Sequence, residues 1–66
     1  MKKIYVQFCN YLYWVDAVEW LDPDTAIIQW DEPGMGRINA TAKYTGEICP
    51  ETGERIYHCG EELTVI

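Results

Sequence analysis

Apolar and polar side chains alternate along two stretches of this 66-residue chain, and this alternation limits its fold more than any other feature. The apolar positions are Ile4, Val6 and Phe8 in the first stretch, and Ile38, Ala40, Ala42 and Tyr44 in the second. Successive side chains of a β-strand point to opposite faces, so a period of two predicts strands with one buried face. We therefore expect the second set to face the core, and Asn39, Thr41 and Lys43 to face solvent.

Turn sequences divide the chain into runs of strand length. Asp22-Pro23-Asp24-Thr25 predicts a type I turn, because Pro presets the second position, and Glu32-Pro33-Gly34 predicts a type II turn, because Gly accepts positive φ at the third. Residues 49–53 mark a third connection and Gly60 a fourth. The expected strands are 3–9, 13–21, 26–30, 37–46, 55–59 and 63–66.

Residues 12–21 fit two alternations that place opposite sets of side chains in the core. Their aromatic and β-branched content favours a strand over a helix, and a β-bulge or burial on both faces would resolve the conflict. Five or six short strands joined by tight turns predict an all-β fold in a single domain, residues 1–66. We expect a curled antiparallel sheet or a small SH3-like barrel, because closure removes exposed strand edges.

Residues 14–31 resemble the second and third strands of SH3-like barrels of the Tudor type. In those domains an aromatic residue opens a strand that contains Ala and Val, an acidic turn follows, and the next strand ends in an aromatic residue and an Asp. Trp14-Val15-Asp16-Ala17-Val18, the turn at Asp22-Pro23-Asp24 and the pair Trp30-Asp31 carry this pattern here. The resemblance covers about a quarter of the chain and implies the barrel fold.

The chain is acidic, with eleven Asp and Glu against five Lys and Arg and a net charge of −6. This balance argues against direct binding to nucleic acid or to an anionic membrane, since both require basic patches. No run of residues is apolar and long enough to cross a membrane as a helix. Six acids lie within seventeen residues that hold no Lys or Arg: Asp16, Glu19, Asp22, Asp24, Asp31 and Glu32.

Such a run predicts a binding surface for a protein partner with a basic surface. Its carboxylates would stand in for phosphates, so the sharper hypothesis is a stand-alone inhibitor that occupies a nucleic-acid-binding surface. Tyr11 and Tyr13 are the aromatic anchors that we assign to this surface, because Tyr is effective at interfaces.

Nine aromatic residues are a large number for 66, and most are expected in the core, because so small a domain needs their buried area. Tyr5, Tyr11, Tyr13 and Tyr57 are expected outside. An alternative interpretation is a Tudor-like module in which rings frame a cationic ligand. The rings considered for that cage are Tyr13, Trp14, Trp20, Trp30 and Tyr44.

Three cysteines are an odd number for a small secreted protein, so reduced thiols in the cytoplasm are expected. The second alternative is a zinc-stabilised fold organised by Cys49, His58 and Cys59, with Cys9 as a further ligand. A zinc knuckle needs a second Cys where Thr52 and Gly53 stand, so no metal and no cofactor is expected. Neither a nucleophile with an orienting base nor a phosphate loop is recognisable, and we expect no enzymatic activity.

Overall fold

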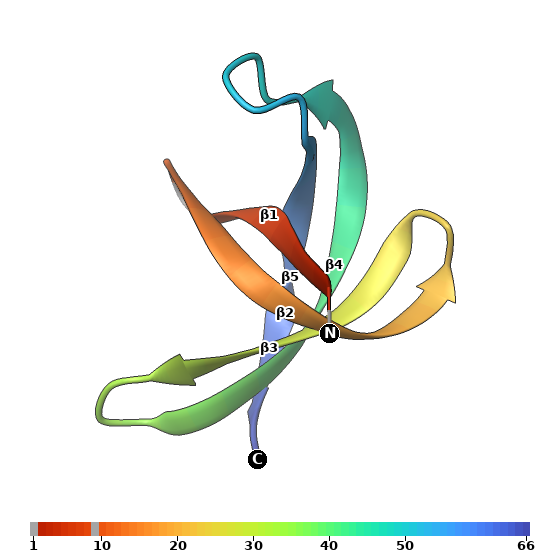
Figure 1. Cartoon of the computed structure of the whole chain (residues 1–66). Coiled ribbons are helices and arrows are strands. Elements are labelled where there is room, and N and C mark those ends of the chain that lie inside the picture. The colour runs from red at the N-terminus through yellow and green to blue at the C-terminus, as the bar shows by residue number, and fades with distance from the viewer. Residues whose placement is uncertain (1, 9) are drawn as a thin grey trace.

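The computed structural model describes residues 2–8 and 10–66, and these fold into five strands that close a barrel in chain order (Figure 1). The strands are β1 Lys2–Phe8, β2 Tyr11–Asp22, β3 Thr25–Glu32, β4 Gly36–Ile48 and β5 Arg55–Val65. Consecutive strands pair antiparallel, and a parallel pairing of β1 with β5 closes the barrel. The prediction of an all-β fold is confirmed, and the arrangement is consistent with a small SH3-like barrel. The described residues include no helix long and apolar enough to cross a membrane.

The expected turn at Gly60 is wrong, because 55–59 and 63–66 belong to one strand, β5. Ala42 pairs with Cys59 and Ala40 pairs with Leu63. Between these two pairs β5 advances by four residues and β4 by two, so β5 contains two extra residues. A glycine in a strand often marks such an irregularity, where the strand bends without ending. Gly60 therefore lies in an irregular stretch of β5, and the described residues form five strands.

The core lies inside the barrel and follows the period of two along each strand. Ile38, Ala40 and Ala42 are buried and Tyr44 packs against the core, while Thr41 and Lys43 are exposed, as predicted. Of the two explanations left open for the conflicting alternations in 12–21, a bulge is the one found, because the register of β2 with β3 shifts between Ala17 and Glu19. The buried core cluster consists of Ile4, Val6, Val15, Ala17, Ala26, Ile28, Ala40, Ala42, Tyr57 and Cys59.

One aromatic side chain expected outside lies in this core. Tyr57 is only 4% exposed and packs against Trp20 and Tyr44, with ring centroids 5.8 and 5.7 Å away. Tyr57 is paired in parallel with Val6, which is buried, so the two side chains share the inner face. Of the other three Tyr residues expected outside, Tyr11 and Tyr13 are exposed, as predicted, and Tyr5 is partly buried.

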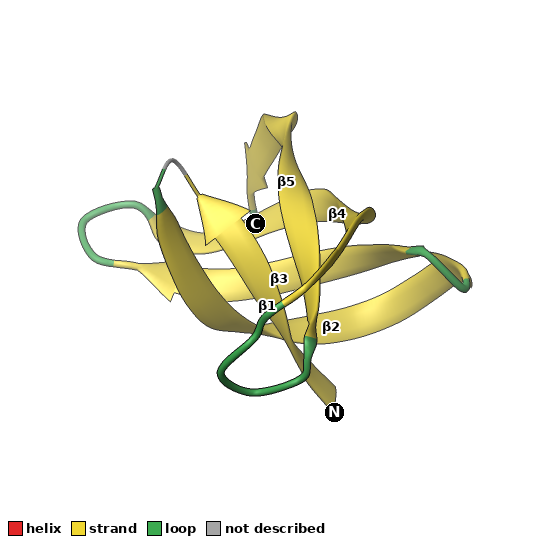
Figure 2. Cartoon of the chain, turned by 90° about the horizontal axis from the view of Figure 1, so that it is seen from above, coloured by secondary structure: helices red, strands yellow, loops and turns green. Residues whose placement is uncertain are grey.

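The turns that connect consecutive strands lie on two sides of the barrel. The turn after Glu32 is a type II turn as predicted, with Gly34 at φ 83° and the Met35 N–H bonded to the Glu32 carbonyl at 3.0 Å. In both Figure 1 and Figure 2 this β3–β4 turn and the β1–β2 hairpin extend to the same side, and the β2–β3 turn lies on the opposite side.

Candidate functional site

The acidic residues singled out in the sequence are divided between two sides of the barrel. Asp22 and Asp24 lie at the β2–β3 turn, and Asp31 and Glu32 lie at the other end of β3, as Figures 1 and 2 allow the reader to follow. An eight-residue strand with a rise of about 3.3 Å per residue separates the two pairs by roughly 23 Å. Glu19 is exposed on β2, between these ends. The run of carboxylates in the sequence is therefore not one continuous surface.

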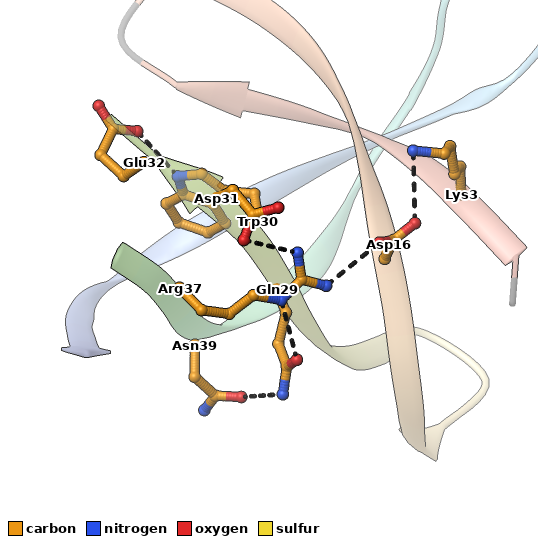
Figure 3. A network of polar contacts seen from close by, with 8 residues as sticks. All are labelled: Lys3, Asp16, Gln29, Trp30, Asp31, Glu32, Arg37 and Asn39. Carbon is orange, nitrogen blue, oxygen red and sulfur yellow. Dashed lines mark hydrogen bonds and ion pairs between the residues drawn. The ribbon is translucent and has the colours of Figure 1, made fainter. Parts of the chain in front are cut away.

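Asp16 is compensated within the fold by two basic side chains (Figure 3). Its carboxylate lies 3.2 Å from the Arg37 guanidinium and 3.4 Å from the Lys3 ammonium. The hydrogen bond from Arg37, and next the one from Lys3, holds the pKa of Asp16 below its ordinary value. Arg37 also lies 3.2 Å from Asp31, and the hydrogen bonds to Asp31 and Asp16 raise its pKa. This network joins β1, β2, β3 and β4 on the outer face of the barrel.

The stabilising effect of Asp16 is expected to disappear in acid. Because the folded pKa lies below the ordinary 3.8, this contribution is complete above that value and is lost as pH falls through the folded pKa. The Asp16→Asn variant should melt below the unmodified protein at about pH 7, and the gap between the two should narrow at about pH 2.5. Thermal melts of both proteins at the two pH values measure this. An equal gap at both would contradict a charged role for Asp16.

An apolar hollow of about 580 Å³ opens between the β1–β2 and β3–β4 hairpins, and we call it the aromatic hollow. Asp31 and Glu32 contribute its acidic lining. Phe8 meets the rings of Trp30 and Tyr13 edge to face, with centroids 5.5 and 6.4 Å apart. The Trp30 indole N–H donates to the Glu32 carboxylate at 3.0 Å. The apolar lining consists of Phe8, Tyr13, Trp14, Val15, Trp30, Met35, Ile38 and Leu63.

The hollow unites some of the residues selected from the sequence and leaves others out. It brings Tyr13 together with Asp31 and Glu32, and Tyr11 contacts the Tyr13 ring, at 6.4 Å, without lining the hollow. Sequence reasoning missed Phe8, Met35 and Leu63 as site residues. Met35 carried a usable signal, because an apolar side chain between two turn glycines has no core to enter. Phe8 and Leu63 carried none, since each resembles an ordinary core position in a strand.

The five rings considered for a cage do not form one. Tyr13, Trp14 and Trp30 line the aromatic hollow, whereas Trp20 lines a second hollow, of about 330 Å³, beside Tyr57. Tyr44 packs on Tyr57 and is covered by the Arg55 guanidinium, 4.7 Å from its centroid. Three of the five rings therefore share one hollow, and the other two lie apart from it.

The two described cysteines, Cys49 and Cys59, are buried, form no disulfide and differ in environment. Hydrogen bonds from the Thr52 hydroxyl, and then from the backbone N–H groups of Glu51 and Thr52, lower the pKa of Cys49, whereas burial raises that of Cys59. His58 is exposed next to buried Cys59, as expected of neighbours in a strand. Cys9 lies outside the described residues. Within residues 2–8 and 10–66, no three His, Cys, Asp or Glu side chains are grouped to hold a metal ion.

No protein-family model matches the chain, and no curated protein or solved structure matches it either.

Proposed function

We propose that this protein is a non-enzymatic binding module that docks on a basic partner protein through the aromatic hollow. The observation that carries the proposal is the combination of an open apolar hollow with two exposed carboxylates, Asp31 and Glu32, in its lining. An apolar side chain of the partner would fill the hollow, and a neighbouring Lys or Arg would meet the carboxylates. Such a combination is typical of an interface anchor with a charged rim.

The exposure of the lining supports this proposal. Tyr13, Trp14, Met35 and Leu63 are all exposed, although a domain of this size needs its apolar area for stability. Grouped exposed apolar side chains on a small protein mark an interaction surface more often than scattered ones do. Tyr and Trp are also enriched among the residues that dominate binding energy.

In its sharper form the proposal is a stand-alone inhibitor that covers a nucleic-acid-binding surface of its partner. The net charge of −6 supports this form, because carboxylates on the docked module would repel nucleic acid from the covered surface. The location that belongs to this proposal is the cytoplasm, and the odd number of cysteines in the sequence supports it. Competition between the protein and nucleic acid for the captured partner tests this form directly.

Replacing Tyr13 with Ala is expected to speed dissociation from the partner by about tenfold or more, because aromatic anchors act mainly after encounter. The partner is first captured from the native host with the unmodified protein and then purified, and binding kinetics are measured on an optical biosensor. Tyr11→Ala is the matched control, because Tyr11 lies two residues away, is also exposed, and does not line the hollow. Dissociation that is equally fast for both variants, or unchanged in both, would contradict docking through the hollow.

A further inference from the structure

The second half of β5 has one edge that the described strands leave open. In the described register β1 pairs with β5 only from Ile56 to His58, whereas β4 pairs with β5 as far as Val65. Beyond His58, β5 therefore continues with β4 on one side, and Figure 1 shows the end of β5 running on to the C-terminus. Leu63 of this segment lines the aromatic hollow, so the open edge and the hollow belong to one surface.

Hydrogen-bond alternation shows which backbone groups face this edge. The Ile66 N–H donates to the Arg37 carbonyl at 2.9 Å, so these two residues form a hydrogen-bonded pair of the antiparallel ladder. Hydrogen-bonded pairs alternate with pairs that exchange no bonds. Thr64 thus bonds to β4, and the N–H and C=O groups of Leu63 and Val65 point away from β4, toward the open edge.

The side chains of these two residues are also left without a cover. Leu63 and Val65 pair with Ala40 and Ile38, so they project from the same, core-facing side as those residues. Ala40 and Ile38 are 3% and 1% exposed, whereas Leu63 and Val65 are 46% and 54% exposed. The core-facing side of β5 therefore continues beyond the pairing with β1, and among the described strands none covers Leu63 and Val65 fully.

We propose that an extended segment of the partner, with alternating apolar and basic residues, adds as a further strand to this edge of β5. The inference rests on the proposed function and specifies how the partner binds. The segment would bond to the backbone of Leu63 and Val65, and its apolar side chains would cover Leu63 and enter the aromatic hollow. Its basic side chains would project from the opposite face of the segment, beside β5, on which Glu61 and Glu62 are exposed.

The negative charge of the protein favours a basic segment of a partner at this edge over a second copy of the chain. Two copies joined through β5 would add the exposed Glu61 and Glu62 of both chains to one joined edge, in proteins that each carry a net charge of −6. Like charges on adjacent strands are destabilising, and exposed charges of this kind protect edge strands from self-association. A basic segment of a partner would instead be attracted to Glu61 and Glu62, because its charges are of opposite sign.

The test uses a capped peptide of alternating Lys and Val, together with two forms methylated on the backbone nitrogen of either the Val or the Lys residues. The two sets of N–H groups point to opposite edges of a strand, so only one methylated form blocks pairing with β5. We expect that form to bind about tenfold or more weakly than the parent, since hydrogen bonds to the edge are lost, and the other form to bind as the parent does. In the complex with the parent, hydrogen exchange at the amides of Leu63 and Val65 should slow.

A variant of the protein gives an independent measurement. Val65→Pro removes one edge N–H and leaves the hydrogen-bonded pairs with β4 in place, so the parent peptide should bind it about tenfold more weakly. Val65→Ala keeps the N–H and is the control that should retain binding. Equal affinity of both methylated peptides, or no binding of the parent, would overturn edge pairing. A dimer of the protein with protected Leu63 and Val65 amides would overturn it in favour of a second copy. Docking through the hollow is tested separately by Tyr13→Ala on the captured partner.

Discussion

Replacing Ala42 with Asp is expected to unfold the protein. Ala42 is fully buried, and its neighbours across the ladders, Ala26 on β3 and Cys59 on β5, are also buried. A carboxylate there would have no basic partner, and an uncompensated buried charge costs about 3–5 kcal/mol. The free energy of unfolding of a domain is roughly 0.05–0.15 kcal/mol per residue, which amounts to about 3–10 kcal/mol for 66 residues. The loss is comparable to the total.

Thr41→Asp is the matched control, because it places the same side chain one residue earlier, on the exposed face of β4. Its cost should stay within about 0.5 kcal/mol, as for most surface substitutions. Circular dichroism during urea titration measures both variants, and Ala42→Asp should lack a folded baseline at neutral pH. A cooperative transition of normal midpoint for Ala42→Asp would mean that the inner and outer faces of β4 are assigned wrongly.

The contrast between these positions could be predicted from the sequence, because alternation depends only on local side-chain direction. In β2 the same rule showed only that two alternations conflict, and the register shift between Ala17 and Glu19 is what resolves the conflict. The type II turn at Gly34 was predicted from the specific chemistry of Pro and Gly. Local prediction failed at Gly60. A glycine that ends a strand and a glycine that bends one have the same neighbours in sequence, and only the pairing of β4 with β5 separates them.

The site was less predictable, because it depends on which strand ends meet. Alternation gives Leu63 and Ile38 the same inner face, yet only Ile38 is covered, since the extent of the β1–β5 pairing decides this. The same holds for Tyr57, which was expected outside and is buried because it is paired beside Val6. Closeness in sequence was also misleading for the acids. Asp24 and Asp31 are seven residues apart, and an extended strand places them at opposite ends of the barrel.

That separation allows a charge-reversal experiment with an internal control, and its expected effect on binding is large. Asp31→Lys with Glu32→Lys reverses the charge in the aromatic hollow, and Asp22→Lys with Asp24→Lys does so at the other end of β3. Each replacement adds two positive charges, so either double variant changes the net charge from −6 to −2. Any difference between the two variants therefore reports the position of the charge on the barrel.

We expect the variant reversed at Asp31 and Glu32 to associate with the captured partner about tenfold or more slowly in about 0.1 M salt. The variant reversed at Asp22 and Asp24 should lose no more than about threefold, because the Debye length is then about 10 Å and its charges lie roughly 23 Å from the hollow. Association of the unmodified protein should slow as salt rises, and the first variant should lose this dependence. Equal slowing of both variants would show that net charge alone attracts the partner. Binding indifferent to salt and to both reversals would leave the apolar lining and the open edge of β5 to account for recognition.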